Sequence, residues 1–207
     1  MDRDRKTRLG ILGSGKGSNM LAIAEACGRG GFSMEVVLVL SDVPEAGILS
    51  LASAHGLSAR FLAPGKFRTK LDEDAERAYV AALREAGVEY VVLAGFMRIV
   101  GNTLLDRFPN KILNIHPALL PSFKGVQGIQ DAFEYGTKIT GVTVHFVDNK
   151  MDHGPIIAQG IVKIEDTDTL ESLEKKIHRL EHKLYPETIN LVVEGKVKID
   201  GRKVKIF

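Results

Sequence analysis

Two polar side chains interrupt an apolar segment near the middle of the chain. Asn114 and His116 lie in the run Leu-Asn-Ile-His-Pro, and their spacing of two places both side chains on one face of a strand. An asparagine amide can donate a hydrogen bond to an oxygen that gains negative charge, and a histidine can transfer a proton near neutral pH. The alternative is a buried, hydrogen-bonded histidine beside an asparagine that caps a loop.

A carboxylate and further histidines follow. Asp152 lies in the polar loop 148–155, where the alternative is a simple turn residue, because turns are rich in aspartate and glycine. His145 lies within a predicted strand, and we interpret it as structural. The run His-Arg-Leu-Glu-His (178–182) matches a zinc-peptidase pattern, but so short a motif recurs by chance, and we expect no metal site.

A glycine-rich turn follows the first apolar strand. Residues 13–19 are Gly-Ser-Gly-Lys-Gly-Ser-Asn, and a helical pattern begins directly after them. Glycines let backbone N–H groups approach an anion, and a helix N-terminus favours negative charge. The turn lacks the Gly-Lys-Ser/Thr ending of a P-loop, and Ser18 replaces the third glycine of a dinucleotide fingerprint. We predict a phosphate monoester site; the alternative is a tight turn capped by Ser18 or Asn19.

The elements that position these groups alternate between short apolar strands and helices. Strands are predicted at 9–12, 35–40, 59–62, 89–94 and 111–115, and helices at 19–27, 44–55 and 72–86. Continuous apolar strands between helices are typical of a parallel sheet covered on both faces, and right-handed crossovers give a doubly wound, Rossmann-like sheet. Polar groups at the carboxyl ends of such strands lie where these sheets bind ligands.

The last third of the chain has a different pattern. Residues 140–147 and 156–164 predict an antiparallel pair, and residues 196–207 predict a hairpin. A long helix is predicted between them, with Asp168 and Glu171 forming its N-terminal cap. The predicted fold class is therefore α/β, with a Rossmann-like, doubly wound, mostly parallel sheet and antiparallel C-terminal strands.

Charge and composition limit the classes of partner. The 207 residues include 28 Lys and Arg and 26 Asp and Glu, a formal net charge of +2, which argues against nucleic-acid-binding and membrane-surface proteins. Cys27 is the single cysteine, so the chain has no internal disulfide. No apolar run approaches the roughly 18 residues of a membrane-spanning helix, and no secretory signal is evident. We expect a cytoplasmic protein.

Several motifs in a fixed order resemble one family. The run Leu-Asn-Ile-His-Pro-Ala-Leu-Leu-Pro (113–121) is similar to a signature of the formyltetrahydrofolate-dependent formyltransferases. Val-Leu-Ala-Gly-Phe-Met-Arg-Ile (92–99), Gly-Val-Thr-Val-His-Phe (141–146) and Asp-His-Gly-Pro (152–155) fit the same family in the same order. Gly-Lys-Gly-Ser-Asn (15–19) narrows the resemblance to the phosphoribosylglycinamide formyltransferases of purine synthesis.

The resemblance implies a reaction and a catalytic set. The reaction is transfer of the formyl group of 10-formyltetrahydrofolate to the amine of glycinamide ribonucleotide, without a metal. Asn114, His116 and Asp152 match the family's catalytic positions. Asn114 and protonated His116 would stabilise negative charge on the formyl oxygen, and Asp152 would hold the imidazolium. A proton would pass from the amine to the leaving N10, with no covalent enzyme intermediate.

The resemblance also implies which residues bind the two substrates. The positions that match contacts to the substrate phosphate and ribose are Gly17, Ser18, Asn19 and Glu181. The positions that match the folate contacts are Met97, Arg98, Ile99, Val100 and Asn114. A basic residue also contacts the folate, and Lys70 and Arg68 are the two candidates. We expect one domain over 1–207, composed of a phosphate-binding half (8–115), a folate-binding and catalytic half (116–195) and the hairpin (196–207).

Other functions remain as alternatives. Methionyl-tRNA formyltransferase and formyltetrahydrofolate deformylase share the folate module, but we expect an additional C-terminal domain in the first and a preceding regulatory domain in the second. A non-catalytic folate- or nucleotide-binding module would need only the glycine turn and an apolar cleft, without the catalytic trio. We expect small-molecule substrates, no nucleic-acid or membrane partner, and a monomer or homodimer.

Overall fold

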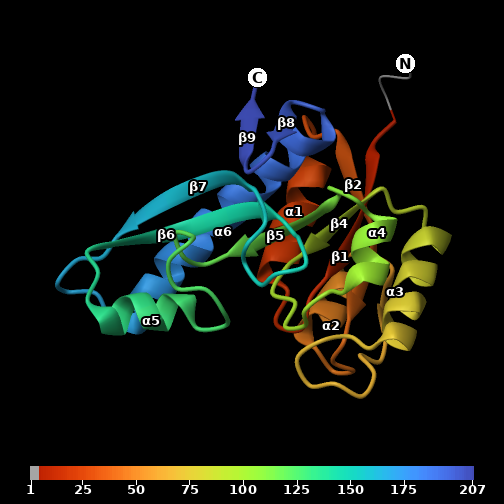
Figure 1. Ribbon diagram of the computed structural model, residues 1–207, viewed down its shortest axis with the longest axis horizontal. Helices are drawn as coiled ribbons and strands as arrows, with labels where there is room; N and C mark the ends of the chain where they lie inside the picture. Colours follow the sequence, from red (N-terminus) through yellow and green to blue (C-terminus); the bar gives the residue numbers. More distant parts are fainter. Residues whose placement is uncertain (1–4) are drawn as a thin grey trace. The chain divides into compact units, whose positions relative to one another are not determined.

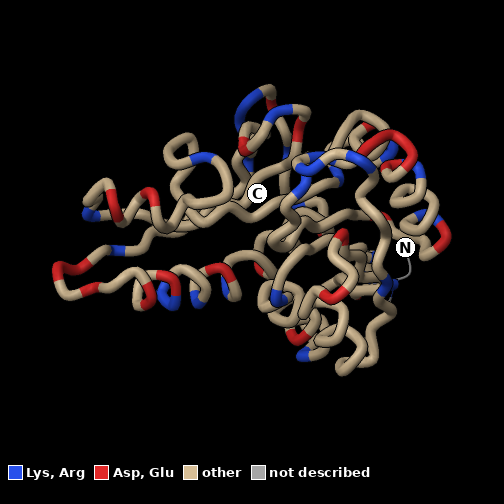
Figure 2. Tube along the Cα trace, turned by 90° about the horizontal axis from the view of Figure 1, so that it is seen from below, with Lys and Arg blue, Asp and Glu red and all other residues tan. Residues whose placement is uncertain are grey.

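The computed structural model describes residues 5–207. The chain divides into two units inside one strand, β5 (Ile112–His116), with the first unit ending at Leu113 and the second beginning at Asn114. No helix in this described range is long and apolar enough to cross a membrane. Lys and Arg are interspersed with Asp and Glu along the chain, as the balanced composition predicts (Figure 2).

The central strand of the first unit is β1 (Thr7–Leu12). It pairs in parallel with β2 (Met34–Ser41) on one side and with β4 (Tyr90–Leu93) on the other. The strand β3 (Ala59–Phe61) pairs in parallel with β2, which gives the order β3-β2-β1-β4. The last four residues of β1 are buried, as expected for an apolar strand inside a parallel sheet.

Helices connect these strands. Those of the first unit are α1 (Ser18–Arg29), α2 (Gly47–Ala54), α3 (Glu73–Glu85) and α4 (Asn102–Arg107). The sequence did not predict α4, which lies beside α3 (Figure 1). The buried Glu76 of α3 accepts hydrogen bonds from the N–H groups of Gly101 and Thr103 at the start of α4. A six-residue helix that is capped from a distant part of the chain has too few turns to show a period in the sequence.

The second unit contains the antiparallel elements. β6 (Ile139–Phe146) and β7 (Ile156–Lys163) pair as predicted, and β5, β6 and β7 are neighbours in that order. The long helix α6 (Leu170–Val193) packs against β6 and β7 (Figure 1). A Cβ atom at Gly160 would lie 2.9 Å from Cδ2 of Leu180, so this glycine allows the close approach of helix and strand.

Three shorter elements complete the second unit. α5 (Gly128–Tyr135), which the sequence did not predict, packs against α6. β8 (Val197–Asp200) and β9 (Lys203–Ile206) form the predicted hairpin, with Gly201 in the turn at a φ of 59°. The expected α/β, Rossmann-like fold class with antiparallel C-terminal strands is confirmed.

The start of α6 corrects the predicted cap. Thr169 is the N-cap: its hydroxyl accepts from the N–H of Ser172 at 3.2 Å, and the Ser172 hydroxyl accepts from the N–H of Thr169 at 3.0 Å. Asp168 instead accepts from Lys176 Nζ at 2.5 Å and from Ser172 Oγ at 2.7 Å. These hydrogen bonds lower the pKa of Asp168 to about 2, and the bond from Lys176 has the largest effect.

We predict that Asp168→Asn makes the stability of the fold less sensitive to acid. The folded-state pKa of Asp168 is about 2, below its ordinary value of 3.8, so the stabilisation is complete above about pH 4 and is lost as the pH falls toward 2. Urea midpoints measured from pH 2 to pH 7 should be lower for the variant at pH 7 and should fall less steeply with acid. Asp74→Asn, at an exposed carboxylate, is the control; equal slopes for Asp168→Asn and wild type would contradict this role.

Candidate active site

His116 ends β5 and is almost fully buried, with 4% of its side chain exposed. Its Nε2 lies 2.8 Å from the carbonyl oxygen of Phe123, and its Nδ1 lies 3.5 Å from Oδ2 of Asp152. Both ring nitrogens therefore face oxygen acceptors. A ring with a proton on each nitrogen is the form that satisfies both of them.

Asn114 contacts a second buried histidine. Its Nδ2 lies 3.2 Å from Nε2 of His145, and Nδ1 of His145 lies 2.8 Å from the carbonyl oxygen of Phe146. Because a carbonyl only accepts, these contacts assign the proton to Nδ1 and make Nε2 the acceptor for the Asn114 amide. Burial lowers the pKa of His145 below its ordinary value of 6.5, which favours this neutral form.

Asp152 completes the cluster of polar side chains. Besides its contact with His116, its Oδ1 lies 3.9 Å from Nε2 of His145. The φ of Asp152 is 46°, in the left-handed region that non-glycine residues rarely adopt, so its surroundings must hold this strained conformation. The structure thus brings together the predicted trio of Asn114, His116 and Asp152, with His145 as a fourth member.

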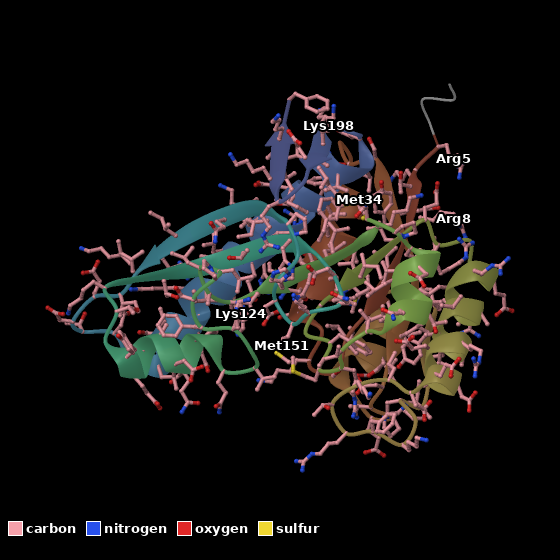
Figure 3. All side chains as sticks on the ribbon, in the orientation of Figure 1. Arg5, Arg8, Met34, Lys124, Met151 and Lys198 are labelled. Atoms are coloured by element: carbon pink, nitrogen blue, oxygen red, sulfur yellow. The ribbon has the colours of Figure 1, made fainter. Side chains whose placement is uncertain are left out.

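Two loops carry the partners of His116. The N–H of Gly125 donates to Oδ2 of Asp152 at 2.8 Å, which joins the loop after β5 to the loop before β7. Lys124 and Met151, the chain neighbours of these two residues, mark the loops in Figure 3. Phe123, whose carbonyl faces His116, also has a positive φ, of 51°. Both acceptors of His116 therefore come from locally strained backbone.

The glycine turn lies in the first unit, at the start of α1. Gly17 is the N-cap residue, with a φ of 88°, so the alternative that Ser18 or Asn19 caps the helix is wrong. A Cβ atom at Gly17 would lie 2.8 Å from Cα of Ile48, so only glycine allows this approach to α2. Because Gly17 has no side chain to cap α1, the N–H groups at the start of the helix can donate to an anion.

The predicted folate segment follows β4. Met97 is 53% exposed and Ile99 38% exposed, whereas Val100 is buried. The N–H of Ile99 donates to the carbonyl oxygen of Thr69 at 2.9 Å, and Lys70 forms a backbone bridge with Ile99. The segment therefore offers exposed apolar side chains, with Lys70, one of the two basic candidates, directly beside it.

Arg98 directs its side chain into the first unit. Its Nε donates to Oδ2 of Asp42 at 2.7 Å, and its Nη1 donates to the carbonyl oxygens of Phe67, at 2.9 Å, and of Arg68. Only 17% of the side chain is exposed. The guanidinium group is thus engaged inside the protein, and the backbone is the part of Arg98 best placed for a ligand.

Glu181 lies on α6, with 5% of its side chain exposed. Its Oε2 lies 3.0 Å from Nδ1 of His178, whose ring stacks on that of His182. Burial, with the nearby charge of Glu181, raises the pKa of Tyr185 well above 10.

Within residues 5–207, no group of three or more His, Cys, Asp or Glu side chains is arranged to hold a metal ion.

The sequence analysis missed the contact between His145 and Asn114. The signal that could have found it is alternation along β6: Thr143 and His145 share one face of the strand, and both are buried. Two buried polar groups on one face require partners, and a nearby polar strand end can supply them. No comparable sequence pattern links Asp42 to Ser14 and Arg98, because these three residues come from three separate segments.

The sequence of this chain is similar to those of known proteins. Residues 7–189 match the formyl transferase family. A phosphoribosylglycinamide formyltransferase of Bacillus subtilis is 41% identical over 182 residues, which are 88% of this chain and 92% of that protein.

Solved structures give the same result. The glycinamide ribonucleotide transformylase 1 of Symbiobacterium toebii has a TM-score of 0.92 and 41% identity, covering 98% of this chain and 94% of that one. A formyltetrahydrofolate deformylase of Pseudomonas syringae has a TM-score of 0.90 but 23% identity, covering 100% of this chain and 68% of that one, a likeness of fold alone. On the family match and the 41% identical relative, this chain belongs to the formyl transferase family.

Proposed function

We propose that this chain transfers the formyl group of 10-formyltetrahydrofolate to the amine of N1-(5-phospho-D-ribosyl)glycinamide, in de novo purine biosynthesis. The products are the N-formyl compound and tetrahydrofolate. The observation that carries the proposal is the buried His116 between two oxygen acceptors, in a cluster with Asn114 and Asp152, in a chain 41% identical to a phosphoribosylglycinamide formyltransferase. The glycine start of α1 supports an acceptor with a phosphate group.

Asn114 and His116 stabilise charge in this proposal. When the amine attacks the formyl carbon, negative charge develops on the formyl oxygen. The Asn114 amide has two hydrogens, and one is directed to His145, so the other can donate to that oxygen. His116, protonated on both nitrogens, donates its Nε2 hydrogen to the same oxygen in place of the Phe123 carbonyl.

Asp152 balances the charge of the imidazolium. Its Oδ2, 3.5 Å from Nδ1 of His116, holds the ring in the charged form, and the N–H of Gly125 fixes that oxygen in turn. The attacking amine must lose a proton, and the leaving N10 must gain one. That proton can pass from the amine to N10 directly or through one water.

Substrate binding is divided between backbone and side chains. The backbone N–H groups of Gly17, Ser18 and Asn19 bind the phosphate, and Glu181 accepts from the ribose hydroxyls. The folate lies against Met97, Ile99 and Val100, the backbone of Arg98, Asn114, and Lys70, the basic residue bridged to Ile99. The exposed apolar side chains of Met97 and Ile99 suit a flat aromatic ring system.

The organisation that we propose is a single catalytic domain over 1–207. Residues 8–115 form the phosphate-binding half, residues 116–195 form the folate-binding and catalytic half, and residues 196–207 form the hairpin. The chain acts in the cytoplasm, as a monomer or homodimer, on small-molecule substrates and without nucleic acid.

A coupled absorbance assay tests the reaction itself. We expect turnover of 10-formyltetrahydrofolate only when glycinamide ribonucleotide is present, because the amine is the acceptor. Equal turnover without the ribonucleotide would indicate a deformylase. A folded protein without turnover under either condition would refute both activities and leave a binding module or another acceptor.

Removal of the catalytic groups should lower kcat while the protein remains folded. We expect His116→Ala and Asp152→Asn each to lower kcat by about 100-fold or more, because each removes stabilisation that is present only in the transition state. His55→Ala is a matched control at an exposed histidine of the first unit. Near-normal kcat in either site variant, with an unchanged thermal midpoint, would remove that residue from the mechanism.

His145 should act through Asn114. We expect His145→Ala to lower kcat by about 10-fold, because the Asn114 amide loses the acceptor that orients it. Asn114→Ala should cost more, and the double variant should cost no more than Asn114→Ala alone. The pKa of His145 is lowered by burial, so the ring is neutral from pH 7 to pH 8 and the loss should be the same across that range. Additive losses would mean that His145 acts independently of Asn114.

A further inference from the structure

A buried carboxylate lies at the end of β2, in the first unit. The side chain of Asp42 is 1% exposed, and both of its oxygens have partners. Oδ1 accepts from Oγ of Ser14 at 2.5 Å, and Oδ2 accepts from Nε of Arg98 at 2.7 Å. A buried charge is costly unless its partners satisfy it, so the positions of these three side chains depend on one another.

Ser14 extends these contacts to the glycine turn and to the segment after β4. Its N–H donates to the carbonyl oxygen of Gly95 at 3.0 Å, and its Oγ accepts from the N–H of Met97 at 2.8 Å. A hydroxyl has one hydrogen, and with that hydrogen on Asp42 its lone pairs are left for Met97. Asp42 therefore orients the Ser14 hydroxyl so that its oxygen accepts a hydrogen bond from the backbone of the predicted folate segment.

Arg98 extends the contacts in the other direction. Its guanidinium donates to the carbonyl oxygens of Phe67 and Arg68, and Ile99 donates to the carbonyl oxygen of Thr69. The ion pair with Asp42 is shielded from water, unlike surface pairs such as that of Arg77, whose side chain is 55% exposed. Shielded pairs are little weakened by salt, so this one can fix backbone positions.

We propose that Asp42 is a positioning residue, which holds the phosphate-binding turn and the folate-binding segment in one geometry through Ser14 and Arg98. Asp42 itself contacts neither substrate. The proposal rests on the function proposed above and adds that both substrate-binding segments of the first unit depend on one carboxylate. Small displacements of binding groups cost affinity even when no contact is deleted, so both segments should bind less well when Asp42 is changed.

Asp42→Asn is the direct test, because it keeps the shape of the side chain and removes its charge. The amide oxygen of the introduced asparagine can still accept from Ser14, but its N–H₂ group then faces the donor Nε of Arg98. We expect the KM values for both glycinamide ribonucleotide and 10-formyltetrahydrofolate to rise about 5- to 20-fold, with kcat within about 3-fold of wild type. Asp74→Asn, at a carboxylate with 91% of its side chain exposed, is the matched control and should change neither KM.

Hydrogen exchange on the full chain gives a readout that is independent of activity. In Asp42→Asn, the amides of residues 13–17 and 95–100 should exchange faster together, while those of α3 should exchange as in wild type. A purely structural role would instead raise exchange throughout the first unit or lower the active fraction, which reduces kcat at constant KM.

The outcomes separate this proposal from the proposed function. If the wild-type protein lacks formyl transfer, the proposed function fails, and the exchange pattern still decides the role of Asp42. If the wild type is active, a rise in only one KM, a fall in kcat alone, or unchanged exchange in either segment overturns the positioning role. Should Asp42→Asn not fold, Ser14→Ala decides: it removes the acceptor of Met97 and should raise both KM values, whereas unchanged values overturn the proposal.

Discussion

Burial makes the polar side chains of the second unit depend on one another. His116 and His145 are buried, and Asn114 and Asp152 are half-buried, so a polar group without a partner would cost more than a hydrogen bond gains. Each has its partner in another member of the cluster or in a nearby carbonyl. Asp152 also has a positive φ, and from this backbone conformation its carboxylate contacts His116 and the N–H of Gly125.

We propose that the first unit binds its ligands differently. Asp42 and Arg98 use their charges within the protein, and the parts proposed to face ligands are backbone N–H groups, exposed apolar side chains and Lys70. Backbone donors at a helix start lose no side-chain entropy when an anion binds. This division explains why glycine matters at position 17 and why Arg98, expected to contact a ligand, has a side chain that instead stabilises the loop.

The sequence predicted those elements whose pattern extends over several turns or strands. The strands of the parallel sheet, the antiparallel pair, α6 and the terminal hairpin all occur where their patterns indicated. The short helices α4 and α5 were missed, since 6 and 8 residues give too few turns to show a helical period. In addition, α4 begins with a cap from Glu76, which lies 25 residues earlier in the chain. At α6 the prediction required an acidic residue three positions after the cap, whereas Ser172 has that role, and Asp168 binds Lys176 instead.

The same limit applies to the site, where the sequence analysis interpreted His145 as structural and did not connect it to Asn114. His116 and His145 are both buried near Asp152, yet one faces two oxygens and the other faces a carbonyl and an amide N–H. Two acceptors suit a doubly protonated ring, whereas an acceptor and a donor suit a neutral ring of one tautomer. The sequence places both histidines on strands, but only the partners from Phe123, Phe146 and Asn114 decide which ring can carry charge. The hydrogen-bond partners of each ring therefore support the catalytic role proposed for His116 and the orienting role proposed for His145.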